Sequence, residues 1–345
     1  MFIKRNFPFK SIMRFSGGHI IWLSLFAILS VVFYEIAGFK WLAIPWLPVS
    51  LIGTAVAFYV GFKNNSAYDR MWEARKIWGA IVNDSRSWGI GIKHFLSDYF
   101  TREELSDSKL QNFKKSLIYR HIAWLYVLRY QLLKPTPWEH VNAGIHIGKT
   151  TKRRIRNYGI GTLKDDIHEN NISGLLSAND IGQLELAKNQ ATRLIDMQAA
   201  ELKDMRNREV IDDFRHMELQ RLLTQFYTHQ GKAERIKNYP LPRQYASISF
   251  IFVGIFVMLL PFGMMPEFSK LGEHFVWLTV PFVVLVGWVF VMMELVGDYS
   301  ENPFEGLGND IPMYSLCRTI EIDLRQMLDE TDLPAKVEPV NNILM

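Results

Sequence analysis

Residues 41–62 read WLAIPWLPVSLIGTAVAFYVGF, and this stretch contains no charged residue. A helix rises about 1.5 Å per residue, so an uncharged run of this length can cross a hydrocarbon core of roughly 30 Å. The run also contains small residues that suit a crowded bundle or a pore-lining helix, namely Gly53, Thr54, Ala55, Ala57 and Gly61. It continues without a breaker into the tryptophan-rich amphipathic pattern KNNSAYDRMWEARKIWG. The sequence therefore predicts one long helix that passes from membrane into water.

Three further apolar blocks cover residues 19–39, 245–265 and 274–293. The overall composition does not reveal these blocks, because a mean hydropathy of +0.01 and 21% charged residues are typical of an ordinary soluble protein. The first block follows basic residues, as a signal peptide does, but it is longer than a signal core and another apolar block follows at once. We therefore expect four retained membrane helices and an all-α fold.

These blocks define the expected domain organisation. We expect an N-terminal segment over 1–18, a membrane hairpin over 19–62, a helical soluble domain over 63–243, a second membrane hairpin over 244–298 and a C-terminal segment over 299–345. Lys and Arg concentrate beside the soluble domain and in the N-terminal tail. By the positive-inside rule both termini and the soluble domain are cytoplasmic, in a bacterial inner membrane, with the bilayer itself as a partner. The net charge of +4 then requires no nucleic-acid partner.

The soluble domain has helical periodicity throughout. Apolar spacing predicts one helix over 110–133, which ends before Pro135, and a second long helical region from about 178 to 231. Trp72, Trp78 and Trp88 are interpreted as packing anchors of the long first helix.

The sequence gives little support to an enzyme, a metal site or a cofactor. His216 and Glu218 lie two residues apart, so a helix would point them to different faces. Cys317 is the only cysteine, which excludes a disulfide framework. Glu35 and Glu294 lie near the ends of their spans, and intramembrane chemistry normally needs more ionisable groups than these.

Three motifs in order resemble the bestrophin family, specifically its bacterial branch. They are the passage IPWLPVSLIG to FYVGFKNNSAYDRMWEARKIWG, the ERIKNYPLP entry to the third span, and NPF after the fourth span. The resemblance extends over residues 5–330. It implies a homopentameric ion channel in which each subunit contributes four membrane helices and a cytoplasmic helical layer, with the second helix lining one central pore.

The resemblance also implies site residues. Three bulky apolar positions spaced four apart form a narrow neck in the family, and Thr54, Phe58 and Phe62 match them. Threonine departs from the bulky aliphatic expected there, which predicts a wider or wetter outer ring. A second constriction at the cytoplasmic mouth is expected at Phe214, with Ile211 as the alternative.

Helical geometry supports the neck independently of the resemblance. Positions 54, 58, 62, 65 and 69 drift slowly around one helical face, so Asn65 and Asp69 continue the same line as an inner vestibule. Five copies would form apolar rings, then an amide ring, then an acidic ring. The alternative is that Phe58 and Phe62 are ordinary bundle packing and that Asp69 pairs with a neighbour.

Calcium activation is doubtful from the sequence. Eukaryotic bestrophins follow NPF with a dense acidic run that clasps calcium, whereas this chain continues EGLGNDIP. Calcium takes six to eight oxygen ligands. Only a weak remnant of that clasp is expected, at Asn302 and Asp310.

The resemblance leaves the sign of the permeant ion open. Family precedent and the partially positive edges of Phe58 and Phe62 favour chloride or another small monovalent anion. Asp69 favours sodium or potassium instead. A membrane-anchored scaffold without ion flux is a further alternative.

Overall fold

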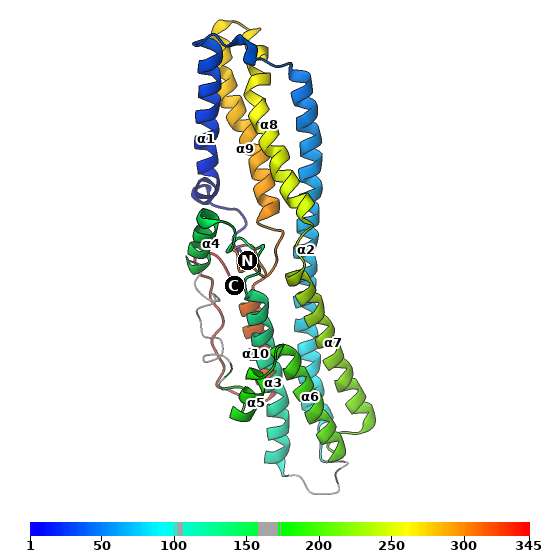
Figure 1. Cartoon of the computed structure of the whole chain (residues 1–345). Helices are drawn as coiled ribbons and strands as arrows, with labels where there is room; N and C mark the ends of the chain where they lie inside the picture. Colours follow the sequence, from blue (N-terminus) through cyan, green and yellow to red (C-terminus); the bar gives the residue numbers. More distant parts are fainter. Residues whose placement is uncertain (100, 102–105, 158–171, 173) are drawn as a thin grey trace. The chain divides into compact units, whose positions relative to one another are not determined.

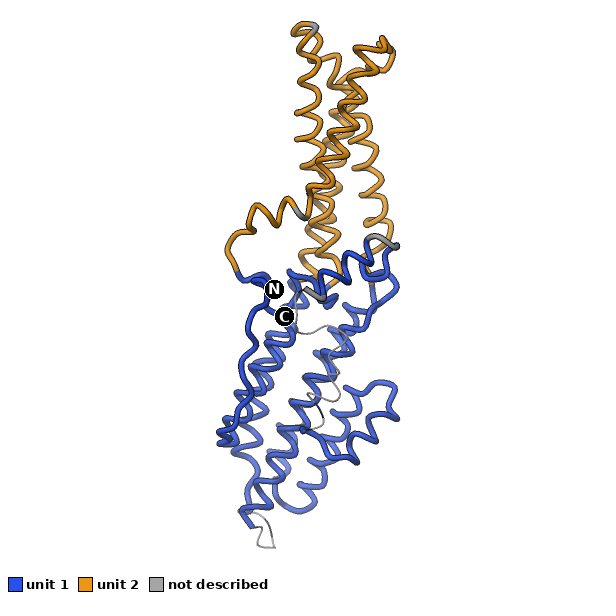
Figure 2. Tube along the Cα trace, turned by 90° about the vertical axis from the view of Figure 1, so that its left-hand side faces the viewer, with its two compact units in different colours: residues 1–3, 72–239, 303–345 blue, residues 4–71, 240–302 orange. Residues whose placement is uncertain are grey.

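The computed structural model describes residues 1–99, 101, 106–157, 172 and 174–345. They divide into two compact units, which Figure 2 colours separately. Unit 1 holds residues 1–3, 72–239 and 303–345, and unit 2 holds residues 4–71 and 240–302. Helix α2 (Trp46–Phe95) is one uninterrupted helix of 50 residues that contributes to both units, so the prediction of a single long helix is confirmed (Figure 1).

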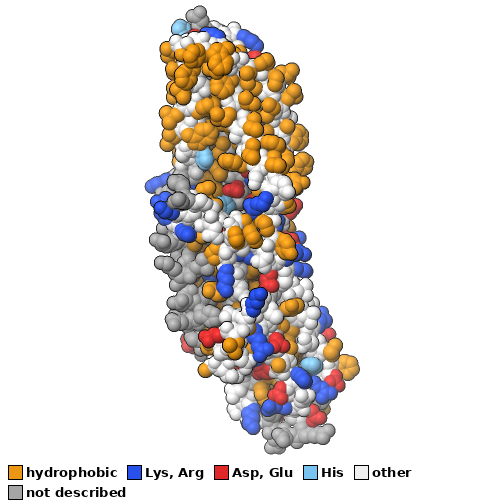
Figure 3. Space-filling model, viewed as in Figure 1, with side chains coloured by type: hydrophobic (Ala, Val, Ile, Leu, Met, Phe, Trp, Pro, Cys, Tyr) orange, Lys and Arg blue, Asp and Glu red, His pale blue; other side chains and the backbone are white. Residues whose placement is uncertain are grey.

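Unit 2 consists of long apolar helices. They are α1 (Phe9–Glu35), the first part of α2, α8 (Arg243–Ser269) and α9 (Thr279–Asp298), with short 3-10 helices η1 (Lys40–Leu42) and η3 (Glu273–Leu278) at their connections. Four helices of the described chain are long and apolar enough to cross a membrane, which confirms the prediction of four spans. Figure 3 shows apolar side chains gathered over the face of these helices that it presents. The chain is therefore a membrane protein.

The core of unit 2 is apolar and closely packed. A Cβ atom at Gly53 would lie only 2.6 Å from the ring of Phe256, so glycine is what lets α2 approach α8 at this level. The buried core residues are Leu23, Ala27, Val49, Val56, Val60, Val253, Phe256, Val257, Leu260 and Val283.

Unit 1 is a layer of helices. It holds α2 from residue 72 onward, α3 (Asp107–Leu133), α4 (Ile145–Asn157), α5 (Ala178–Glu185), α6 (Gln190–Asn207), α7 (Asp213–Asn238) and α10 (Met313–Met327). Helix α3 confirms the helix predicted over 110–133. Trp78 and Trp88 are fully buried, as packing anchors should be, whereas Trp72 is 45% exposed.

The region from 178 to 231 is divided, so the prediction of one long helical region there was too coarse. Each of its helices starts at a polar cap: Ser177 accepts a hydrogen bond from the Asp180 amide, Asn189 from the Thr192 amide, and Asp212 from the Arg215 amide. Side-chain oxygens at these positions satisfy amides that a helix start leaves unpaired. The caps therefore begin new helices where apolar periodicity alone suggested continuation.

His121 lies at the centre of the core of unit 1. Its ring is fully buried, stacks on Trp124 with centroids 5.3 Å apart and lies 4.4 Å from the Phe226 ring. Its Nε2 lies 2.9 Å from the Ser85 hydroxyl, and its Nδ1 has no hydrogen-bond partner in the described part of the chain. Burial lowers the pKa of His121 to about 3.

We expect this histidine to make unit 1 acid-sensitive. Its folded-state pKa lies below the unfolded value of about 6.5, so only the unfolded chain gains a proton as pH falls below 6.5. Between pH 7 and pH 5 this group should lower the free energy of unfolding by about 2 kcal/mol. Thermal unfolding of His121→Gln across this range should show a weaker pH dependence than the wild type. Equal pH dependence would show that the histidine does not titrate on unfolding.

Candidate functional site

The predicted neck residues lie on an uncovered face of α2. Phe58 and Phe62 are each 67% exposed, and Thr54, Asn65 and Asp69 are exposed as well. The Thr54 hydroxyl donates a 3.0 Å hydrogen bond to the Ser50 carbonyl oxygen of its own helix. One face of one helix thus carries two aromatic rings, then an amide, then a carboxylate.

The opposite face of the same helix is buried. Val56, Val60, Lys63 and Ala67 have almost no exposed area, so α2 is anchored to its own unit by that side. Within a single chain, Phe58 and Phe62 are therefore not part of the bundle core. The alternative that these two rings pack inside the helical bundle of their own subunit is therefore excluded.

A buried ion pair fixes α2 directly beside the predicted neck residues. Lys63 follows Phe62 and is 1% exposed, and its ammonium group pairs with the buried carboxylate of Glu294 on α9. The other Glu294 oxygen accepts a hydrogen bond from the Ser249 hydroxyl on α8. Sequence reasoning placed these charges at the ends of spans and missed their pairing, although a lysine and a glutamate in otherwise apolar helices were the available signal.

The next residue of α2 strengthens this attachment. The Asn64 amide donates to the Met293 carbonyl oxygen at 3.0 Å. A Cβ atom at Gly297 would fall 2.1 Å from the Asn64 side-chain oxygen, so any larger residue there would have to displace the Asn64 side chain. Residues 63 and 64 thus join α2 to α9, and Glu294 in turn links α9 to α8.

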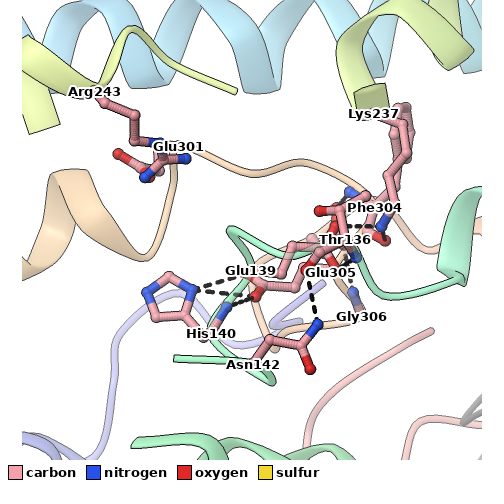
Figure 4. Close-up of polar contacts among 11 residues, drawn as sticks. Thr136, Glu139, His140, Asn142, Lys237, Arg243, Glu301, Phe304, Glu305 and Gly306 are labelled. Carbon is pink, nitrogen blue, oxygen red and sulfur yellow. Dashed lines mark hydrogen bonds and ion pairs between the residues drawn. The ribbon is translucent and has the colours of Figure 1, made fainter. Parts of the chain in front are cut away.

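The segment after α9 is also held by polar contacts within unit 2. Arg70 donates through Nε to the Glu301 carbonyl oxygen at 2.9 Å, and Arg243 lies 3.4 Å from the buried Glu301 carboxylate (Figure 4). The next residue, Asn302, is buried, and its amide group has no hydrogen-bond partner in the described residues.

In unit 1 the segment after NPF uses its acidic residues to hold its own backbone. The buried Asp310 carboxylate accepts hydrogen bonds from the amides of Phe304, Gly306 and Ile311 at 3.0, 2.8 and 2.7 Å. These bonds support a turn in which Phe304 and Gly306 both have positive φ. Burial raises the pKa of Asp310, and the same amides oppose the shift.

Two buried acid–base contacts surround this turn. Lys237 pairs with Glu139 and also lies 3.3 Å from the Phe304 carbonyl oxygen. His140 contacts the Glu305 carboxylate through both its backbone amide and its Nδ1 (Figure 4). No group of three or more potential metal-ligating His, Cys, Asp or Glu side chains occurs among the described residues. The Asp310 carboxylate is thus engaged by three backbone amides of the turn.

The two candidates for the second constriction differ sharply in exposure. Phe214, in the first turn of α7, is 87% exposed, whereas Ile211 is 1% exposed in the interior of unit 1. Of the two side chains, only Phe214 is available to line an opening.

Comparison with known proteins assigns the family. The family model described as "Bacterial/Fungal Bestrophin protein" matches residues 11–326. The chain belongs to the bestrophin family. Proteins that are similar to it include the voltage-dependent anion channel-forming protein YneE of Escherichia coli K12, which is 28% identical over 85% of this chain and 80% of that protein. The protein of the same name from Salmonella typhi is 26% identical over 92% of this chain and 87% of its own length.

A solved bestrophin structure shows the same fold. The crystal structure of a bacterial bestrophin homolog from Klebsiella pneumoniae matches with a TM-score of 0.72 at 20% identity, covering 90% of this chain and 97% of that one. The expected bestrophin-type, all-α fold with four membrane helices is thereby confirmed.

Proposed function

We propose that this bestrophin is an ion channel that conducts chloride or other small monovalent anions. The uncovered face of α2 in unit 2 carries this proposal, because it places Thr54, Phe58 and Phe62 in line and free of intrachain contacts that would bury them. The anion-channel names of the bestrophin relatives favour the same function.

One helical face cannot enclose a pore, so the proposed channel requires a closed ring of subunits. The bestrophin resemblance implies a homopentamer. In such a ring Phe58 and Phe62 would form successive apolar rings, with Asn65 and Asp69 beyond them and Phe214 as a second constriction. Apolar rings can gate conduction by excluding water, and phenylalanine edges carry partial positive charge that favours an anion.

A monovalent cation channel of the same fold is the second candidate, and the exposed carboxylate of Asp69 favours it. A ring of carboxylates raises the local concentration of cations and repels anions. The two candidates share the same pore and differ only in the sign of the ion that crosses it.

Planar-bilayer recording of the purified protein under a salt gradient separates these proposals. A reversal potential at the chloride equilibrium value is expected for the anion channel, and one at the sodium value would support the cation channel instead. Absence of current, together with a monomeric or dimeric mass in detergent, would support a scaffold without ion flux.

Neutralising Asp69 tests its role in selectivity. Asp69→Asn should shift the reversal potential toward the chloride value, with roughly a fivefold rise in the chloride-to-sodium permeability ratio, which corresponds to about 1 kcal/mol of electrostatic free energy at the ring. The exposed Glu185 of α5 offers a matched control as Glu185→Gln, for which no shift is expected. If Asp69→Asn behaves like this control, Asp69 does not face the ion path.

We further propose that this bestrophin lies in a bacterial inner membrane with both termini and unit 1 in the cytoplasm. The distribution of Lys and Arg beside the spans supports this orientation.

A further inference from the structure

Helix α4 of unit 1 has an unusually basic sequence. It reads IHIGKTTKRRIRN and contains Lys149, Lys152, Arg153, Arg154 and Arg156 without any acidic residue. Nothing in the proposed pore uses this helix. Its composition is typical of helices that lie on an anionic surface.

One side of α4 packs against its own unit. Gly148 and Thr151 are buried, and a Cβ atom at Gly148 would lie 2.7 Å from the Val141 carbonyl oxygen. The spacing of Lys149, Lys152 and Arg153 is i, i+3 and i+4, which places them together on another face. All three side chains are exposed. These three residues are called the basic face of α4.

The basic face is distinguished by how closely its charges lie together. Its three basic residues are neighbours on a helix that contains no acidic residue, whereas exposed arginines such as Arg206 and Arg208 have acidic partners in Asp213 and Asp204. Across the described parts of the chain, no ion pair is found for the three residues of the basic face. Three neighbouring like charges repel one another unless an anionic partner approaches them.

We propose that the basic face of α4 binds the anionic phospholipid headgroups of the bilayer that this chain spans. A membrane protein remains tethered to that surface, so its effective concentration near α4 exceeds that of any soluble anionic partner. Each lysine or arginine near an anionic leaflet contributes additively to attraction, and the interaction falls off within a Debye length. The basic face then acts as a lipid-dependent contact between unit 1 and the membrane surface.

A fluorescence experiment on the full-length protein tests this binding without relying on ion flux. An environment-sensitive probe is attached to Thr150→Cys on α4, while the fully buried native Cys317 should resist labelling. The protein is reconstituted in phosphatidylcholine bilayers with or without phosphatidylglycerol, each containing a trace of lipid with a nitroxide headgroup. We expect strong quenching of the probe only with phosphatidylglycerol, and less quenching as salt is raised.

Charge-neutralising variants make the test specific. We expect the equilibrium ratio of membrane-bound to released α4 to fall roughly a hundredfold when three contacts are removed together, because their contributions are additive. The variant that removes them combines Lys149→Gln, Lys152→Gln and Arg153→Gln. The matched control neutralises exposed lysines elsewhere in unit 1, as Lys188→Gln, Lys203→Gln and Lys232→Gln, and should quench like the wild type.

Three outcomes would overturn the proposal. They are equal quenching in both bilayers, unchanged quenching in the neutralised variant, and suppression by millimolar inorganic phosphate at constant ionic strength, which would indicate a site for soluble anions. Circular dichroism confirms that each variant is folded. Because the readout is lipid proximity, its failure is distinguishable from failure of the channel proposal.

Discussion

Replacing Phe58 and Phe62 together with alanine is expected to raise single-channel conductance roughly threefold to tenfold. Both rings are two-thirds exposed on the face of α2 proposed to line the pore, so their removal would widen the narrowest apolar section and let water enter it. A tenfold rise corresponds to about 1.4 kcal/mol of lowered barrier. Single-channel recording in planar bilayers measures the change directly.

A matched control separates pore lining from general loss of aromatic surface. Phe250 of α8 and Phe282 of α9 are also exposed in unit 2, and the corresponding double alanine variant should conduct like the wild type. Unchanged conductance in the Phe58 and Phe62 variant would place these rings in packing between subunits or against lipid rather than in the ion path.

Lys63→Met is expected to be the most destabilising single change in unit 2. It would leave the Glu294 carboxylate buried, with the Ser249 hydroxyl as its one remaining partner among the residues that the structure describes. Removing one member of a buried ion pair typically costs about 3–5 kcal/mol. Replacing both members with methionine should restore most of the loss, since no charge then remains buried. The half-life of the folded protein in detergent at a fixed elevated temperature measures both effects.

The ion pair should also control the rotational position of the neck. Phe62 directly precedes Lys63, so release of Lys63 would free this turn of α2 to rotate. The rate of modification of Phe62→Cys by a charged thiol reagent should therefore change when Lys63→Met is added, and return toward its original value in the double methionine background. If the rate stays constant while stability falls, the pair stabilises unit 2 without setting the orientation of the neck.

The fold was largely predictable because its membrane helices are marked by an absence of charge. The run at 41–62 and the three other apolar blocks each satisfied the length that a bilayer demands, and no proline or glycine cluster interrupted α2 after residue 62. Helix starts in unit 1 were less predictable. Asn189 and Asp212 are good N-caps, yet the apolar periodicity continues past both of them. The sequence pattern therefore did not reveal that one helix ends and another begins at each of these positions.

The neck positions stay a prediction, but the contacts that hold this part of α2 in unit 2 could not be predicted from the sequence. The resemblance to the bestrophin family assigned Thr54, Phe58 and Phe62 to the neck, and their spacing along one helical face agreed with it. The Lys63–Glu294 pair joins residues 231 positions apart, and each charge by itself resembled an ordinary flanking residue of a span. The sequence also could not choose between Phe214 and Ile211. In the structure Ile211 precedes the Asp212 cap and is buried, whereas Phe214 follows it in the first turn of α7 and is exposed.

The hydrogen bond from Thr54 to Ser50 changes what an ion would meet if Thr54 forms the outer ring of the proposed pore. Its hydroxyl proton is already donated to the helix backbone, so threonine offers a passing anion no free donor to replace lost hydration. The side chain then differs from valine mainly by an oxygen that can still accept a hydrogen bond. The sequence predicted that Thr54 would make the outer ring more hydrated. Toward chloride, however, Thr54 would act like a small apolar residue, because it could not replace the water that chloride loses on entering the ring.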